Sequence, residues 1–213
     1  MKTLGIETST LTGSVALVED GRLLGETTLS VSVRHSERLM PAIEHLLRDA
    51  EVAPSEIDLF AVAEGPGSFT GLRIGIAAAQ GLALAHGRPV AGVSTLKGLA
   101  MNAAVFPGLV VPLLNAFRGE VYFGVYRMEG GRPVPVQEDA VLPVAAFLER
   151  FRSLEGDTLF LGDGVGLLKG DGDPMKGRMA PALFDAPRAA NIALLAEGSS
   201  PSAVLPRYLR KPV

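Results

Sequence analysis

The sequence contains no cysteine and no tryptophan among its 213 residues. The absence of cysteine excludes disulfide bonds, zinc sites built from thiolates and a cysteine nucleophile. Only three histidines are present, His35, His45 and His86, and no two of them are three or four residues apart. They therefore lack the spacing with which one helix presents two ligands to a metal ion. The G-x-S-x-G and H-E-x-x-H motifs of hydrolases are missing as well. We predict no metal site and no catalytic residue.

Positive charge is not in excess. The chain has 20 lysines and arginines against 23 aspartates and glutamates, which gives a formal net charge of −3, and no basic stripe stands out. Nucleic acids are bound largely through cations that neutralise phosphates. If this protein works on RNA, we expect another protein to hold the RNA.

Long hydrophobic runs are also missing. The most apolar stretch, residues 74–85, contains Gln80 and several small residues and is too short to span a membrane. The N-terminal residues lack the apolar core of a signal peptide. We expect a cytoplasmic protein that makes no contact with a membrane.

The sequence is organised as two similar halves, each of which begins with three strands. Asp20-Gly21 and Gly130-Gly131 are strong hairpin signals between the second and third strand of each half. In the first half we expect strands at 2–7, 14–19, 22–30, 57–63 and 89–93, and helices at 36–50, 70–85 and 94–104. In the second half we expect strands at 109–114, 120–126, 132–141 and 158–161, and helices at 144–151 and 188–196.

This order of elements resembles the ribonuclease-H-like unit, in which three antiparallel strands are followed by helices and further strands in one mixed sheet. The sequence therefore predicts an α/β protein with an actin-like ATPase fold, made of two βββαβα subdomains of which the second is degenerate. We place the subdomains at residues 1–105 and 106–213.

A glycine-rich segment, Gly65–Gly75, connects a strand to a helix. Two interpretations are open. Backbone N–H groups at the start of a helix form an anion site, and together with the end of the first strand they could hold a phosphate. The residues of this vestigial site would be Glu7, Thr8, Ser9, Gly65, Gly67 and Ser68. The alternative is a tight turn in which Ser68 or Thr70 caps the helix, and composition alone favours it.

Small residues repeat at every fourth position of the helix that follows, at Gly71, Gly75, Ala79 and Ala83. Such a strip allows another backbone to approach closely. It is compatible with docking onto another subunit and, equally, with packing on the protein's own sheet.

Several segments together resemble the bacterial TsaB family, also called YeaZ. They are Leu4–Ser9, Arg34–Pro41, Gly65–Gly75, Gly92–Leu96 and Pro206–Arg210. They occur in the family's order and spacing, and the match extends over essentially the whole chain. The resemblance implies a partner subunit of TsaD, which transfers threonylcarbamoyl to the adenosine beside the tRNA anticodon. It also implies a role for the ATPase TsaE, a homodimer when TsaD is absent, and only indirect contact with tRNA.

The resemblance also implies that the chain itself is not an enzyme and binds no cofactor, since ATP is used by the partner subunits. TsaD carries two histidines where this chain has Thr95 and Leu99. These positions are four apart on a helix and could share a metal, but a hydroxyl and an isobutyl group are poor ligands for it. For the surface that contacts the partner we predict six residues: His35, Leu39, Ile43, Gly71, Gly75 and Ala79.

One segment departs from the family. TsaB sequences commonly have Asp-Ala-Arg before a Gly-Glu-Val-Tyr strand, whereas this chain has Asn115-Ala116-Phe117-Arg118. The departure puts an ion pair of that loop in doubt. An alternative function remains: a small actin-fold ATPase or kinase that uses Glu7 and the Gly65–Gly71 loop. A peptidase is disfavoured, because the sequence offers neither a nucleophile–base pair nor a metal site.

Overall fold

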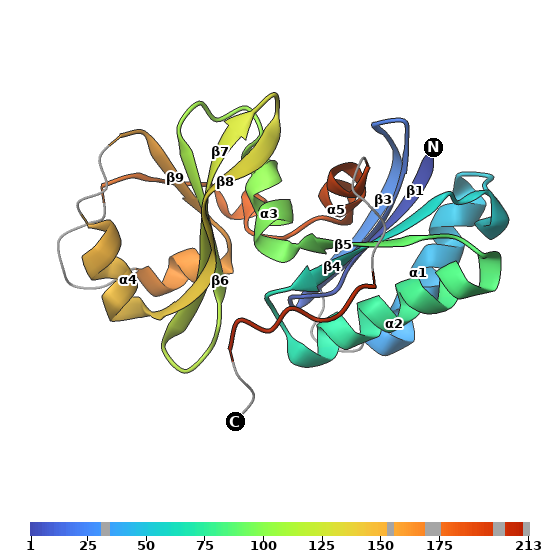
Figure 1. The fold of residues 1–213 in the computed structure, drawn as a ribbon, viewed down its shortest axis with the longest axis horizontal. Helices are drawn as coiled ribbons and strands as arrows, with labels where there is room; N and C mark the ends of the chain where they lie inside the picture. The colour runs from blue at the N-terminus through green and yellow to red at the C-terminus, as the bar shows by residue number, and fades with distance from the viewer. Residues whose placement is uncertain (31–34, 153–155, 169–175, 198–202, 211–213) are drawn as a thin grey trace. The chain divides into compact units, whose positions relative to one another are not determined.

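The structure is a computed structural model that describes residues 1–30, 35–152, 156–168, 176–197 and 203–210. It divides into two compact units. The first unit comprises Met1–Gly98 and Pro187–Tyr208, and the second comprises Leu99–Ala186 and Leu209–Val213. Figure 1 shows the elements of both units. No helix of the described residues is long and apolar enough to cross a membrane.

The first unit is built on a five-stranded sheet in the order β3-β2-β1-β4-β5. Its strands are β1 (Lys2–Glu7), β2 (Thr12–Glu19), β3 (Arg22–Ser30), β4 (Leu59–Gly65) and β5 (Val90–Ser94). The first three are antiparallel, whereas β1, β4 and β5 run parallel. Asp20 and Gly21 both have positive φ at the β2–β3 turn, as a two-residue hairpin requires.

Two helices cover one face of this sheet, α1 (His35–Asp49) and α2 (Phe69–His86). Leu4 and Ile6 of β1 point to that face and pack in one apolar cluster with Ile43 and Ile76 of the helices. Pro41 lies inside α1. A proline inside a helix leaves one carbonyl without its N–H partner but does not always end the helix.

The opposite face is covered by α5 (Ala189–Ala196), which comes from the far end of the chain. Gly5 allows its approach, because a Cβ at this position would lie 2.2 Å from the carbonyl oxygen of Ala189. Ser14 accepts a hydrogen bond from the amide of Ala189 at 2.9 Å. Glu26 accepts one from the amide of Ala190 at 3.0 Å and pairs with Arg188.

The predicted boundaries therefore need correction. We placed residues 106–213 in the second subdomain, but Pro187–Tyr208 belongs to the first unit, and the first unit's opening segment ends at Gly98 and not at 105. The physical reason is that α5 is apolar on nearly all sides and is almost completely buried. A helix of this kind must pack on a surface that no other element covers. The face of the first sheet that carries Gly5 and Ala16 is such a surface.

Glu26→Gln tests this attachment of α5. The change removes the ion pair with Arg188 and the negative charge at the helix N-terminus. Because Arg188 is half exposed, we expect the free energy of unfolding to fall by only about 1–2 kcal/mol. Urea unfolding measures this loss. Glu19→Gln on the same sheet serves as the control, because its partner Lys2 keeps a second carboxylate, that of Glu56, when Glu19 is neutralised. Equal stability of the Glu26→Gln variant and the wild type would contradict the role given to Glu26.

The second unit repeats the order of the first, with a five-stranded sheet β10-β9-β6-β7-β8. Its elements are β6 (Leu109–Asn115), β7 (Glu120–Glu129), β8 (Arg132–Pro143), α4 (Val144–Phe151), β9 (Thr158–Leu161) and β10 (Arg178–Met179). After β9 comes a short 3-10 helix, Asp163–Leu168, where the first unit has the 18-residue α2 after β4. In the described residues the second copy is therefore the reduced one, as predicted.

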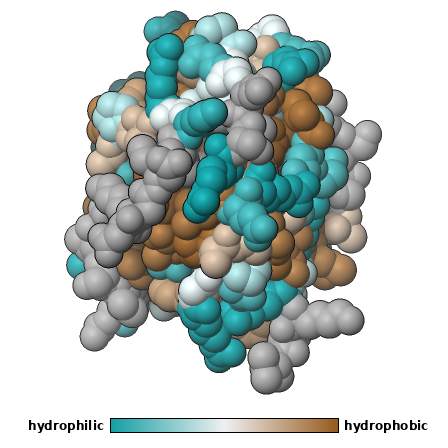
Figure 2. Space-filling view, turned by 90° about the vertical axis from the view of Figure 1, so that its left-hand side faces the viewer, coloured by the Kyte–Doolittle hydropathy of each residue, from teal (hydrophilic) through white to brown (hydrophobic). Residues whose placement is uncertain are grey.

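Aromatic side chains fill the core of the second unit. Phe147 of α4 lies 5.1 Å from Phe123 and 4.5 Å from Phe151, measured between ring centroids. Figure 2 shows the face that carries α4, on which hydrophobic residues gather near the centre among hydrophilic ones. Val144 and Leu148 of α4 pack against this core and are only partly buried. The core of the second unit thus reaches close to the surface beside α4.

The two units are joined through α3 (Thr95–Ala100), which continues into a 3-10 helix at Met101–Ala103. The predicted helix at 94–104 is therefore one short α-helix with a 3-10 turn. Thr95 and Leu99, the two positions that the sequence analysis considered as places for metal ligands, are both completely buried. In the described residues the hydroxyl of Thr95 has no hydrogen-bond partner.

Candidate functional site

Glu7 ends β1 with its side chain completely buried. The amide of Ser9 donates a hydrogen bond of 2.5 Å to Glu7 Oε1, whereas Oε2 has no partner among the described residues. Burial raises the pKa of Glu7 from 4.5 to about 7, and hydrogen bonding from Ser9 opposes this rise only in part. Burial therefore favours the protonated form of the Glu7 carboxyl in the folded protein.

The glycine-rich segment packs directly on the residues that follow Glu7. A Cβ at Gly67 would lie 2.4 Å from the carbonyl oxygen of Ser9, and one at Gly71 would lie 2.0 Å from that of Thr8. The hydroxyl of Thr8 donates to the carbonyl of Gly71 at 2.8 Å. Glycine is required here because no side chain fits between the two backbones.

The start of α2 is closed by bonds within the chain. The amide of Ser68 donates to the carbonyl of Ser9 at 2.7 Å. The Ser68 hydroxyl accepts a hydrogen bond of 3.2 Å from the amide of Gly71 and so caps α2. The structure brings the six residues predicted for a phosphate site together, but two of the amides that a phosphate would need are already used. These contacts favour the capped turn, the second of our interpretations.

A segment near the C-terminus lies on this glycine-rich turn, and we call residues 204–208 the strap. Val204 is buried in the core of the first unit, and its carbonyl accepts a hydrogen bond of 2.9 Å from Gln80. The amide of Arg207 donates to the carbonyl of Glu64 at 2.6 Å. Gly65 makes room for this approach, since a Cβ there would lie 2.6 Å from the carbonyl oxygen of Arg207.

The strap ends in a cluster of three exposed side chains, Phe69, Arg73 and Tyr208. The rings of Phe69 and Tyr208 are stacked with centroids 5.1 Å apart. The guanidinium carbon of Arg73 lies 3.8 Å from the Phe69 centroid, and Arg73 Nε donates to the Tyr208 hydroxyl at 3.1 Å. Our sequence analysis missed this cluster. The four-residue spacing of Phe69 and Arg73 was a visible signal, but the contact with Tyr208 spans 135 residues of sequence.

Most of the residues predicted to contact a partner are not exposed. Five of the six are buried within the chain: Leu39, Ile43, Gly71, Gly75 and Ala79. The strip of small residues on α2 packs on the protein's own β1, with a Cβ at Gly75 only 2.3 Å from Thr8 Oγ1. His35 starts α1, and its side chain lies outside the described part. Of the two interpretations of the strip, packing on the protein's own sheet is the one that the structure supports.

The same two helices nevertheless carry an exposed surface. On α2 it includes Arg73, Ala77, Gly81 and Leu84, of which Leu84 is 86% exposed. Between α1 and α2 lies an open, mainly apolar groove of about 550 Å³. Its lining includes Met40, Ile43, Leu47, Phe60 and Leu82.

The segment that departs from the family forms the β6–β7 turn. Phe117 and Arg118 both have φ above +50°, in the left-handed region that residues other than glycine rarely adopt. Asn115 Oδ1 accepts a hydrogen bond of 2.8 Å from the amide of Phe117. The amide of Asn115 donates to Asp163 at 2.9 Å, and burial raises the pKa of this carboxyl. An Asx turn therefore holds the strained backbone.

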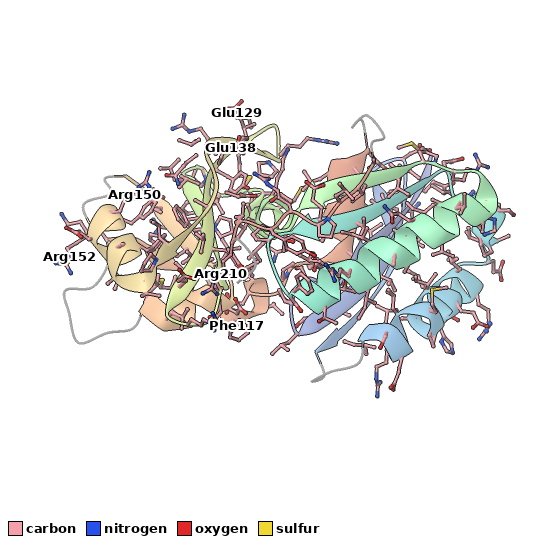
Figure 3. All side chains as sticks on the ribbon, turned by 60° about the horizontal axis from the view of Figure 1, so that its bottom comes forward. Phe117, Glu129, Glu138, Arg150, Arg152 and Arg210 are labelled. Carbon is pink, nitrogen blue, oxygen red and sulfur yellow. The ribbon has the colours of Figure 1, made fainter. Side chains whose placement is uncertain are left out.

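An ion pair lies beside this turn. Arg210 lies 3.0 Å from the carboxylate of Glu120, and it also donates to the carbonyl of Ala116. Figure 3 shows Phe117 and Arg210 at one end of the second unit and Glu129 and Glu138 at the other. Phe117 is 66% exposed. Among the described residues there is no group of three His, Cys, Asp or Glu that could hold a metal ion.

Comparison with solved structures identifies the fold first. The fold is that of the actin-like ATPases: the activator of 2-hydroxyisocaproyl-CoA dehydratase from Clostridium difficile superposes with a TM-score of 0.52 at 11% identity, over 95% of this chain and 100% of that one. The predicted fold class is thereby confirmed. The family model of TsaD, tRNA N6-adenosine threonylcarbamoyltransferase, matches residues 27–168.

Closer relatives define the family. TsaB from Bacillus subtilis, a tRNA threonylcarbamoyladenosine biosynthesis protein, is 36% identical over 99% of this chain and 94% of its own. YeaZ from Pseudomonas aeruginosa is 33% identical and superposes with a TM-score of 0.82 over 98% of this chain and 99% of that one. The chain belongs to the TsaB family of tRNA threonylcarbamoyladenosine biosynthesis proteins. The resemblance found in the sequence is confirmed.

Proposed function

We propose that this chain is a non-catalytic subunit on which a TsaD transferase docks while it modifies tRNA. The observation that carries the proposal is the closed junction between the end of β1 and the start of α2. At this junction Ser68 N is bound to Ser9 O, Ser68 Oγ caps α2 and Glu7 is completely buried. Phosphate binding would have to break these bonds, which supports a role other than ATP hydrolysis.

Thr95 and Leu99 give further support. Both are completely buried, and neither side chain is a suitable ligand for a metal ion at this site. We accordingly propose that the chain binds no cofactor, that ATP is used by its partners TsaD and TsaE in the cytoplasm, and that tRNA is held by TsaD.

For the docking surface we propose the exposed side of α1 and α2. These two helices carry an exposed leucine at the end of α2, small residues at Ala77 and Gly81, and an apolar groove lined by Met40 and Leu82. Because the TsaD family model matches residues 27–168, which include α1 and α2, we infer that TsaD has a matching pair of helices. We propose that a second copy of this chain occupies the same surface when TsaD is absent. A stable complex needs about 1,000 Å² or more of buried surface.

Leu84→Asp tests this surface. The change places a charge where an apolar contact is proposed, and we expect binding to TsaD to weaken at least about tenfold. Calorimetric titration with TsaD of the same organism measures the affinity. Val105→Asp is the matched control, because Val105 is 97% exposed and lies in the second unit. Unchanged affinity of the Leu84→Asp variant would refute the proposed surface.

A reconstituted modification assay separates the scaffold role from an enzymatic one. With TsaD, TsaE and tRNA present, omission of this chain should abolish formation of threonylcarbamoyladenosine, and the Glu7→Gln variant should restore it. The isolated chain should neither bind nor hydrolyse ATP in the presence of magnesium. Micromolar ATP binding with turnover that is lost in Glu7→Gln would establish the alternative, a small ATPase.

A further inference from the structure

The cluster of Phe69, Arg73 and Tyr208 presents hydrogen-bond donors in a fixed arrangement. The Arg73 guanidinium lies against the Phe69 ring, with its carbon 3.8 Å from the centroid. Its Nε is oriented by the bond to the Tyr208 hydroxyl at 3.1 Å. The guanidinium carries five N–H donors, and this bond uses one of them. Contacts on one face and one edge therefore fix the plane of the group.

The remaining donors of this cluster have no acceptor among the described residues. Arg73 forms its hydrogen bond only with Tyr208 there, and it makes no ion pair with a described carboxylate. The Tyr208 oxygen accepts from Arg73, so its own proton is available to another acceptor. The two terminal nitrogens of Arg73 and the Tyr208 hydroxyl can thus donate to one anionic group. A planar fork of this kind fits the two oxygens of a carboxylate.

The position of Tyr208 is itself fixed by the strap. The amide of Arg207 donates to the carbonyl of Glu64, and Val204 is buried. The aromatic ring of Tyr208 stacks on Phe69, which is the first residue of α2. The donors are consequently held by two separate parts of the chain, and little side-chain freedom is lost when a ligand binds.

The surroundings of the cluster favour a protein as the source of the anion. The exposed face of α2 continues from Arg73 to Ala77, Gly81 and Leu84, which are small or apolar. An RNA backbone is bound by several cations in succession, whereas no other cation stands on this exposed strip. Aromatic residues and arginine beside apolar neighbours are typical of the centre of a protein interface.

We infer that Arg73 and Tyr208 form a receptor for a carboxylate of the protein that docks on α2. The inference rests on the proposed function, and it identifies an acidic side chain of TsaD as the polar group that fixes the docking. The bond is charge-assisted and lies at the edge of an apolar surface, where it contributes both to affinity and to the register of the two helices.

Calorimetric titration of the full chain with TsaD of the same organism tests the inference. Arg73→Gln should weaken binding at least about tenfold and should remove most of its dependence on salt. Arg73→Lys should restore only part of the affinity, because an ammonium keeps the charge but not the planar fork. Tyr208→Phe keeps the stacked ring and loses only the hydroxyl, and we expect binding several times weaker. Arg88→Gln, beyond the other end of α2, is the matched control and should bind like the wild type.

A double-mutant cycle identifies the partner group. Each aspartate and glutamate on the docking face of TsaD is neutralised in turn, and one of these changes should have no further effect in the Arg73→Gln background. Urea unfolding midpoints of all variants establish that the loss of binding is not a loss of folding.

The outcomes separate this inference from the proposed function. If the wild-type chain binds TsaD and supports modification but Arg73→Gln binds equally well, the receptor is refuted and the scaffold role stands. If the wild type does not bind TsaD, both fail. If Arg73→Gln weakens binding of tRNA and not of TsaD, the anion is a phosphate and the inference is overturned.

Discussion

Replacement of Gly71 with alanine is expected to lower the free energy of unfolding by about 3 kcal/mol or more, because two backbones would have to move apart. A Cβ at this position would lie 2.0 Å from the carbonyl oxygen of Thr8. The hydrogen bond from the Thr8 hydroxyl to the Gly71 carbonyl would be strained as well. Urea unfolding followed by circular dichroism measures the effect.

Gly81 provides a matched control on the same helix. It is exposed, and a Cβ there would meet nothing within 4 Å. Gly81→Ala should raise the free energy of unfolding by about 0.5–1 kcal/mol, since alanine favours the helix. If both variants were stabilised, Gly71 would have space and the close contact between β1 and α2 would be wrong. A side chain at Gly71 or Gly75 would collide with Thr8 of the same chain. A loss of partner binding after either substitution would therefore not identify an interface.

The second large effect concerns the dependence of stability on pH. The pKa of Glu7 is raised from 4.5 to about 7 in the folded protein, and this difference corresponds to about 3 kcal/mol. Between these values the folded state holds a proton that the unfolded state has released, so the free energy of unfolding falls as the pH rises. The contribution of Glu7 is fully present below about pH 4.5 and is lost as the pH passes through about 7.

Glu7→Gln removes this titration. The difference in free energy of unfolding between the variant and the wild type should shift by about 3 kcal/mol in favour of the variant between pH 4.5 and pH 8. Chemical unfolding at a series of pH values gives this difference directly. Glu56→Gln alters an exposed carboxylate, and its unfolding free energy should not gain on that of the wild type as the pH rises. A Glu7→Gln profile parallel to that of the wild type would show that Glu7 is ionised in the folded protein.

The strand order of each unit could be predicted because its signals are local. Asp20-Gly21 and Gly130-Gly131 have the positive φ values that their sequence requires, and the alternating strands follow from these turns. The capped start of α2 at Ser68 was also among the predicted alternatives, since its residues are neighbours in sequence.

Other features depend on contacts between distant segments. The apolar residues of α5 predict burial but do not say which sheet the helix covers, and only Gly5 and Ala16 on β1 and β2 decide it. The strip of Gly71, Gly75 and Ala79 is compatible with two kinds of packing, and only the contact with β1 shows that it packs on the protein's own sheet. The stacking of Phe69 on Tyr208 cannot be found from the pattern of either segment alone.

The placement of α5 has a consequence for protein synthesis. The five strands of the first sheet have all been made once Ser94 leaves the ribosome, but the helix that covers one of its faces begins only at Ala189. Throughout translation of the intervening residues, the surface around Gly5 and Ala16 lacks its cover. Nascent chains with such uncovered sheets are prone to aggregation. The first unit therefore cannot cover this face of its sheet before residues 99–186 of the second unit have been made.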